Sequence, residues 1–441
     1  MNQDFMKKKP PFTLVVSMSL PMVLSMLVNS LYNIIDSYFI AKISEDAMTA
    51  LSLVFPIQNL VNAAAIGFGI GINAAVSYYL GAGDTKAANY SASQGLLLSG
   101  IHGLIFMIAC PVLMPIFLGT YTNNTSIISF ALRYSYIVFA FSIVINIGIT
   151  FEKIFQSVGK MTVSMVSMLC GCIINIILDP LLIFGAGWIP SMGIEGAALA
   201  TGIGQTVTLI LYIVIYRIKS LPLYLQFKRI STGKKQWKRL YSVGIPAALN
   251  LALPSILISA LNGILSHYSQ MYVLILGIYY KLQTFIYLTA NGIVQGIRPL
   301  VGYNYGAKEY KRVKQIHMTA LSLCSIVMLV GMIICLFSSE ILMGIFTATP
   351  KTIQAGANAL QIISCGFVVS AVSVMTCGTL EGLGKGFSSL IISLIRYILI
   401  IPAAFLLSRM LGVTGVWHAF WVIELIACII SVHILHSIFT V

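Results

Sequence analysis

The sequence predicts an all-α polytopic membrane protein with about twelve transmembrane helices in two six-helix lobes related by pseudo-two-fold symmetry. The chain is 58% hydrophobic and only 9% charged, more apolar than a soluble core of 441 residues needs. Charge-free runs recur, and each can hold at least one bilayer-crossing helix of about 20 residues. The first run is too long, and too well followed by others, to be a cleaved signal peptide. The runs cover 10–35, 47–83, 87–132, 240–280, 315–339 and 352–380.

The individual helices follow from these runs in order. The longest polar segment, 217–239, carries eight Lys and Arg residues and separates the sixth span from the seventh. We therefore expect an N-lobe over 1–222 and a C-lobe over 223–441. The expected spans centre near 14–40, 47–79, 90–118, 128–150, 161–184, 193–216, 241–265, 271–300, 316–338, 353–380, 387–408 and 411–437.

The basic residues predict the orientation of the chain. With Lys7–Lys9 on the inner side and alternate threading, twenty Lys and Arg fall inside and four outside. Cytoplasmic loops of membrane proteins collect such residues. We therefore interpret the net charge of +14 as topology rather than nucleic-acid binding. Both termini and the central loop are expected in the cytoplasm. We expect the chain to be a multi-pass protein of the cell membrane and to be a monomer.

An internal repeat at a shift of 225 residues supports two lobes. Leu20-Pro21 aligns with Ile245-Pro246, and "QSVGK" (156–160) aligns with "EGLGK" (381–385). The turn "YYLGAGDTKAA" (78–88) aligns with "YNYGAKEYKRV" (303–313). Each repeat holds an even number of spans, so both halves enter the membrane in the same direction. The pseudo-two-fold axis is therefore expected along the membrane normal, with a cavity between the halves.

Several kinds of chemistry lack their sequence signals. The eight cysteines form no CxxC pair, the histidines have no HxxxH spacing, and no Walker A motif occurs. We expect no disulfide framework, no zinc site, no cofactor and no direct use of ATP. A membrane prenyl or glycosyl transferase would need paired acids such as DDxxD, which are absent. A carrier is therefore favoured over an enzyme, and the repeat favours it over a passive channel.

One carboxylate lies inside an apolar run, in "SLYNIIDSYFI" (30–40), where Asp36 is the first charge after Lys9. An ionisable residue in a span predicts a functional site by default. The fifth span offers Asn175 and Asp179, which share a helix face at i and i+4, and the sixth offers Thr201 about two turns in. All four are expected near the outer side.

Oxygen ligands in an apolar surrounding suit a hard cation, so sodium or a proton is predicted as the coupling ion. Simpler interpretations remain open. Asp36 could be interfacial and hydrated, Asn175 could only tie two helices together, and Asp179 could cap a kink at Pro180.

The whole arrangement resembles the MATE (multidrug and toxic compound extrusion) transporters, from Pro21 to the last span. The resemblance rests on the twelve spans, the Pro21 and Asp36 pair, "YYLGAGD" with its partner "YNYGA", "QSVGK", and "NIILDPLLIFG" followed by "MGIEGAALAT". It implies an antiporter that exports amphipathic, mostly cationic organic compounds by alternating access and contributes to antibiotic resistance. It also implies a cation site at Asp36, Asn175, Asp179 and Thr201, and a bend at Pro21.

The C-lobe departs from one sodium-coupled branch of that family, which has acids in spans seven and ten. Here span seven has no charge, and span ten has none before Glu381. The C-lobe instead has Lys281, Arg396 and Glu424 within spans. Lys281 is expected either to form an ion pair, with Glu424 as the candidate partner, or to face a cavity.

A substrate cavity is expected from Gln58 and Gln283, which are equivalent in the repeat, together with Tyr32, Lys281 and Glu424. Aromatic rings could add surface for flat cations or only pack against lipid. These rings are Tyr32, Tyr279, Tyr280, Phe285 and Tyr287. A flippase of lipid-linked saccharides remains the nearest alternative, although it would need a larger and more basic cavity.

Overall fold

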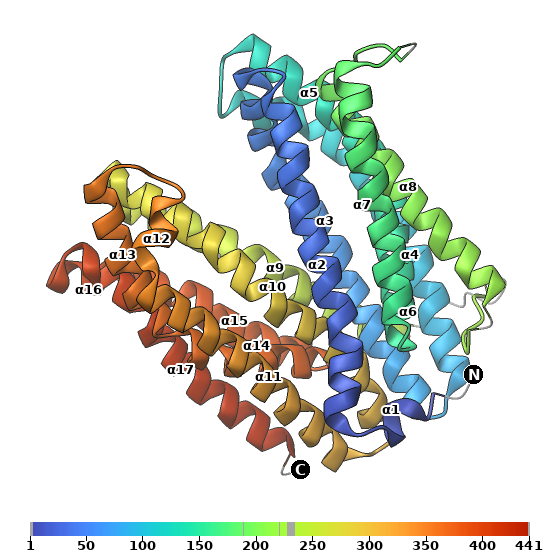
Figure 1. The fold of residues 1–441 in the computed structure, drawn as a ribbon. Coiled ribbons are helices and arrows are strands. Elements are labelled where there is room, and N and C mark those ends of the chain that lie inside the picture. The colour runs from blue at the N-terminus through green and yellow to red at the C-terminus, as the bar shows by residue number, and fades with distance from the viewer. Residues whose placement is uncertain (1–2, 188, 220, 227–233, 440–441) are drawn as a thin grey trace. The chain divides into compact units, whose positions relative to one another are not determined.

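The computed structural model describes residues 3–187, 189–219, 221–226 and 234–439, and this part of the chain is helical (Figure 1). Its one β-bridge joins Ala186 to Ile189. Lys228 and Arg229 of the expected basic loop lie outside the described residues. The helices are α1 (Phe5–Lys8), α2 (Pro11–Ala41), α3 (Glu45–Gly81), α4 (Thr85–Gly119), α5 (Thr125–Ala140), α6 (Ser142–Ser157), α7 (Met161–Phe184), α8 (Ile194–Ile218), α9 (Lys234–Ser266), α10 (Gln270–Gly306), α11 (Tyr310–Phe337), α12 (Ser339–Gly344), α13 (Pro350–Ser364), α14 (Phe367–Gly382), α15 (Gly386–Ile398), α16 (Ile400–Leu411) and α17 (Val413–Phe439).

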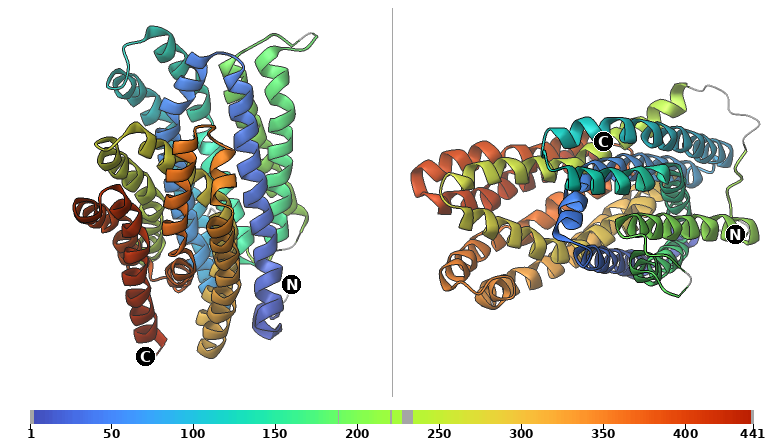
Figure 2. Two further views of the ribbon diagram at one scale, coloured as in Figure 1. Left: turned by 60° about the vertical axis from the view of Figure 1, so that its left-hand side comes forward. Right: turned by 90° about the horizontal axis from the view of Figure 1, so that it is seen from above.

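The expected spans are confirmed in number and order. Ten helical segments of the described chain are long and apolar enough to cross a membrane, one of them formed by α15 and α16 together. Two bent pairs raise the number to twelve: α5 with α6, bent by 47°, and α13 with α14, bent by 52°. The long, straight helices are visible from two further directions in Figure 2. The chain is therefore a multi-pass membrane protein.

Turns between the spans repeat their backbone geometry in the two halves. Gly83 has φ +76°, and Lys308, which is 225 residues later, has φ +61°. The turn requires a left-handed backbone conformation at this position. Glycine adopts that conformation without steric cost, whereas lysine adopts it at some cost. Side-chain caps start the neighbouring helices: Ser44 accepts from the Ala47 amide, and Asp84 from the Ala87 amide.

The chain packs as two compact units whose limits also differ by 225 residues. The first unit contains Leu24–Ala248, and the second contains Asp4–Val23 and Leu249–Val441. The sequence predicted one division, at 222/223. The structure instead assigns the beginning of α2 to the second unit and the beginning of α9 to the first. Each of these helices continues from one unit into the other.

Glycines explain where the exchanged helix ends pack. A Cβ on Gly292 or Gly296 of α10 would overlap the backbone of α2 at Val23 or Ser19. In the first unit, Gly67 and Gly71 of α3 meet α9 in the same way. Only glycine permits such close helix crossings, which add packing contacts where water does not drive association.

The bends occur at equivalent positions and are packed in opposite ways. The first bend lies at Phe141, whose ring fills the place of a side chain on Gly202 of α8. The second lies at Gly366, where a Cβ would come within 3.1–3.2 Å of Trp421 of α17. In the first unit, the large residue Phe141 is at the bend and the small residue Gly202 is on the neighbouring helix. In the second unit, the small residue Gly366 is at the bend and the large residue Trp421 is on the neighbouring helix.

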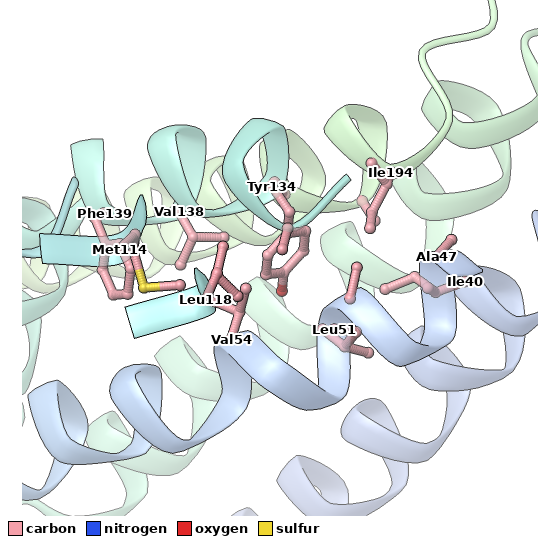
Figure 3. Packing of buried hydrophobic residues seen from close by; sticks show 14 of the residues in the cluster. Ile40, Ala47, Leu51, Val54, Met114, Leu118, Tyr134, Val138, Phe139 and Ile194 are labelled. Carbon is pink, nitrogen blue, oxygen red and sulfur yellow. The ribbon is translucent and has the colours of Figure 1, made fainter. Parts of the chain in front are cut away.

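A hydrophobic cluster in the first unit supports the ends of α2, α5, α7 and α8 (Figure 3). Tyr134 projects from α5 into this cluster and is 2% exposed. Ile40 of α2 and Ile194 of α8 also belong to it. Each lies four to seven residues from a predicted site residue, so the cluster fixes the helix ends that carry the site.

Candidate functional site

Three of the four predicted cation-site residues lie near corresponding ends of their helices, and Asn175 lies one turn deeper. Asp36 is five residues before the end of α2, and Asp179 is five residues before the end of α7. Thr201 follows the start of α8 by seven residues. At 1.5 Å per residue these positions are about 8–11 Å from the helix ends. The side chains of Asp36 and Asp179 interact electrostatically, so the structure brings them together.

The crossing of α7 and α8 determines the position of Asn175. Gly171 and Gly204 face each other, and a Cβ on either would come within 2.7 Å of the other's carbonyl oxygen. One turn further along, the Asn175 Nδ2 donates to the Thr201 Oγ1 at 3.4 Å. Because the amide is used in this way, the Asn175 carbonyl oxygen points elsewhere and accepts no hydrogen bond.

The site has more buried oxygen atoms than partners. Asp36, Asn175 and Asp179 are at most 7% exposed. The Oδ1 atoms of Asp36 and Asn175 and both carboxylate oxygens of Asp179 are buried without a hydrogen bond. No ion pair among the described residues involves either aspartate. A buried carboxylate without a partner is costly, so both aspartates require a cation or a proton.

Two tyrosines complete the surroundings of the site. Tyr32 lies near Thr201 and interacts electrostatically with both aspartates. Tyr134 lies near Gln58 and also interacts electrostatically with both aspartates. The sequence placed Tyr32 and Gln58 in a substrate cavity and did not single out Tyr134. Tyr134 directly follows Arg133 and is one of several tyrosines in the predicted spans, so nothing in the sequence singled it out.

The donor set fits a hard monovalent cation. Carboxylate, amide and hydroxyl oxygens are the atoms that such cations prefer, whereas soft metals select sulfur and nitrogen. No group of three or more His, Cys, Asp or Glu that could hold a metal occurs within the described part of the chain. Two aspartates supported by Asn175 and Thr201 therefore suit sodium or protons more than a transition metal.

The second unit contains a cavity of about 320 Å³ between α9, α10 and α13–α17. Gln283 and Glu424, both predicted for a substrate cavity, line it, as do Tyr279, Tyr280 and Tyr287. Lys281 does not line this cavity, and it is exposed with its Nζ 5.8 Å from the centre of the Phe346 ring. Phe285 is 50% exposed and lies outside the lining as well.

The ion pair between Lys281 and Glu424, one of the two interpretations of Lys281, is not formed. Glu424 instead accepts from Arg396, with Nη2–Oε1 at 2.7 Å and Nε at 3.0 Å from both carboxylate oxygens. Arg396 lies in the last turn of α15 and faces α17, whereas Lys281 lies on the outer face of α10. The sequence showed all three charges but not the helix faces that they occupy.

Further polar groups near the other helix ends also form pairs. Lys153, one of the twenty basic residues that alternate threading places on the inner side, is 3% exposed and donates to Glu152 at 2.8 Å. Arg298 donates to Glu381 at 2.7 Å, and Glu381 also accepts from Asn250. Pro21 lies inside a continuous α2, two residues before the division between the units. Its role as a bend point stays a prediction.

Two repeated six-helix units with buried carboxylates in a membrane span define a secondary-transporter class of protein. Comparison with known families agrees. The MatE family model matches residues 21–181 and again 246–406, at the same 225-residue shift that relates the two halves. The chain therefore belongs to the MatE family, and it is a transporter of that family.

Similar proteins extend over the full length. The multidrug export protein MepA of Staphylococcus aureus (strain MRSA252) is 26% identical over 99% of this chain and 97% of its own length. The protein of the same name from Staphylococcus haemolyticus (strain JCSC1435) is 26% identical over 97% of this chain and 94% of its own length.

Two solved structures share the fold. One is a MOP superfamily transporter from Pyrococcus furiosus, and the other is described as a multidrug resistance MATE family transporter. Both are 21% identical, with a TM-score of 0.93 over 100% of this chain and 98% of theirs.

Proposed function

We propose that this transporter exports amphipathic, mostly cationic organic compounds in exchange for sodium. The observation that carries the proposal is the pair of buried aspartates, Asp36 and Asp179, which have unsatisfied oxygens and no basic partner. The name of the two curated relatives, multidrug export protein, supports the substrate class.

In this proposal, the cation is bound by oxygen atoms of four side chains. Asp36 and Asp179 supply negative charge, while the Asn175 carbonyl and the Thr201 hydroxyl supply further oxygen. Burial keeps these side chains away from bulk water and so strengthens the electrostatic interactions. Sodium, or a proton shared by the aspartates, removes the cost of burying them.

Coupling would act through α2. Asp36 lies on the part of α2 that belongs to the first unit, whereas residues before Leu24 belong to the second. Cation binding draws the end of α2 towards Asp179 on α7. Transport then needs only that the cation and the drug favour different conformations, since a ligand shifts an equilibrium by its differential affinity.

The proposal includes a monomeric protein of the cell membrane with both termini in the cytoplasm. The excess of Lys and Arg on that side supports this orientation. Small organic compounds and lipids are then its partners, and nucleic acid is not. Export of toxic compounds would contribute to antibiotic resistance.

The test uses purified protein in proteoliposomes that contain a fluorescent organic cation. An inward sodium gradient at equal pH is compared with a proton gradient in the absence of sodium. We expect sodium-dependent efflux in the wild type and its loss in Asp36→Asn. Glu45→Gln is the matched control, because Glu45 is exposed in the first turn of α3.

Each other outcome changes the conclusion. Efflux with the proton gradient alone, also lost in Asp36→Asn, would replace sodium by protons at the same residues. If neither gradient moves the cation through the wild type, the export proposal is wrong.

A further inference from the structure

A basic patch lies where the N-terminal segment meets the turn between α10 and α11, and all of it belongs to the second unit. Its basic residues are Lys7, Lys8, Lys9, Lys308, Lys311, Arg312 and Lys314, and its acidic residues are Asp4 and Glu309. The two acids pair with Lys8 and Lys7, both at 2.9 Å. The other five basic side chains form no ion pair within the described part of the chain. The patch therefore has a large excess of positive charge.

Buried contacts hold the two parts of the patch together. Met6 is fully buried, and its carbonyl oxygen accepts from Asn304 at 3.2 Å and from Arg312 at 3.1 Å. Arg312 also donates to the carbonyl oxygen of Lys9. A hollow of about 230 Å³ is lined by Lys7, Glu309, Lys311, Arg312 and Gln315. The basic groups therefore surround a concave space whose walls are fixed by the fold.

The turn itself does not need this charge. The equivalent turn of the first unit joins α3 to α4 with the sequence "GDTKAAN" (83–89), in which Lys86 is the only basic residue. The second unit has "KEYKRVK" (308–314) instead. Lys308 even takes the left-handed conformation that Gly83 takes in the first unit, at a steric cost that glycine avoids. Orientation in the membrane depends on how many basic residues lie on one side, not on their gathering around a hollow. The gathering therefore indicates an anionic ligand.

The place of the patch identifies the kind of anion. Both α10 and α11 are long and apolar enough to span the membrane, so the turn between them lies at the boundary between lipid and water. Anionic lipid headgroups at this boundary attract Lys and Arg. One face of α11 packs on α10, α13 and α14, and the opposite face is exposed. Along that exposed face, at helical spacing, follow Lys311, Gln315, Met318, Ser322, Ile326, Leu329 and Ile333. A phosphate group in the hollow therefore has a mostly apolar helix face beside it for acyl chains, which a soluble anion would not use.

We propose that the basic patch binds an anionic phospholipid, with the phosphate group in the hollow beside Lys311 and Arg312 and the acyl chains along the exposed face of α11. The Gln315 amide can donate to the same phosphate. The inference does not depend on the proposed export function, because it involves neither the cation site nor the cavity of the second unit. It also holds on whichever side of the membrane the patch lies.

The experiment measures lipid binding to the purified full chain by native mass spectrometry. Phosphatidylglycerol is compared with phosphatidylcholine of the same acyl chains, and glycerol 3-phosphate serves as the free headgroup. We expect the wild type to bind phosphatidylglycerol about tenfold or more tightly than phosphatidylcholine. Glycerol 3-phosphate at equal concentration should not displace the lipid. The preference should weaken as the salt concentration rises, because exposed charges are screened.

Variants connect the preference to the patch. Lys311→Gln/Lys314→Gln removes two charges and leaves the contacts of Met6 intact. Each basic residue near an anionic lipid contributes about fivefold in affinity, so this variant should bind phosphatidylglycerol about 20- to 30-fold more weakly and phosphatidylcholine as before. Lys311→Arg/Lys314→Arg keeps the charge and should bind like the wild type. The matched control is Lys86→Gln/Lys219→Gln, which removes two exposed lysines from the first unit.

Three results would overturn the inference. The first is equal affinity of the wild type for the two lipids, which needs no variant to be folded. The second is an equal loss of phosphatidylglycerol binding in the Lys86→Gln/Lys219→Gln control, which would show a general effect of net charge. The third is displacement of the lipid by an equal concentration of glycerol 3-phosphate, which would show a site for soluble anions.

Discussion

Replacing Asp179 with asparagine removes one negative charge from the cation site and keeps the shape of the side chain. Asp179 is fully buried, and neither of its oxygens has a hydrogen-bond partner. The structure therefore predicts opposite effects with and without sodium. The variant should lose affinity for the cation, but it should be more stable than the wild type when no cation is present.

The magnitudes follow from the contacts. A hydrogen bond or contact with a charged group contributes about 1.5–3 kcal/mol, so sodium should bind roughly 10- to 150-fold more weakly. Burying an unpaired polar group costs about 1–3 kcal/mol by protein mutational data, and a charge costs more. Asparagine still buries a polar group, so we expect stabilisation of about 1 kcal/mol in sodium-free buffer at neutral pH.

Thermal unfolding of purified protein at several sodium concentrations measures both effects. Ligand that binds only the folded state raises stability by RT ln(1 + [L]/Kd), so the wild type should gain stability with sodium and Asp179→Asn much less. Potassium at equal ionic strength controls for salt, and Glu45→Gln controls for the loss of a carboxylate. Equal sodium-dependent shifts in wild type and Asp179→Asn would refute the role of this residue.

Three further predictions concern a helix crossing, a buried ion pair and the hydrogen bonds that hold the N-terminal segment. Gly171→Ala should separate α7 from α8, cost about 1–3 kcal/mol, and weaken sodium binding without touching a ligand atom; unchanged binding would contradict this. Glu381→Ala leaves Arg298 without its carboxylate and should cost about 3–5 kcal/mol in unfolding experiments, far more than the loss of an exposed pair. Arg312→Ala removes donors to the carbonyls of Met6 and Lys9, so hydrogen exchange should quicken in residues 4–9 and not elsewhere.

The helices and the positions of the candidate site residues could be predicted from the sequence because both depend on local signals. An apolar run between charges determines a membrane span, and the i, i+4 spacing places Asn175 and Asp179 on one face. Two aspartates in otherwise apolar helices stand out for the same reason. The contact of Asn175 with Thr201 required only that α7 and α8 be antiparallel neighbours, which alternate threading supplies.

What the sequence did not indicate depends on helix rotation and on long-range packing. The partner of Glu424 depends on which faces α10 and α15 turn towards α17. The sequence shows which residues are charged, but it does not show the rotation of each helix. The bends at Phe141 and Gly366 lack a shared residue type, because the bulk that fills each bend comes from different helices. Pairing of residues 141 with 202 and 366 with 421 becomes visible only in the packed units.

The exchanged ends of α2 and α9 have a consequence for the order in which the protein folds. The first twenty residues leave the ribosome early, but the glycines that receive them, Gly292 and Gly296, are made much later. At about 5–20 residues per second, the beginning of α2 waits on the order of tens of seconds for its packing partner. The second unit is built from two separate pieces of the chain, and the first unit extends beyond the central loop to Ala248. A gene divided at the central loop would therefore yield two halves that each lack a helix end and that must be synthesised together to complete each other.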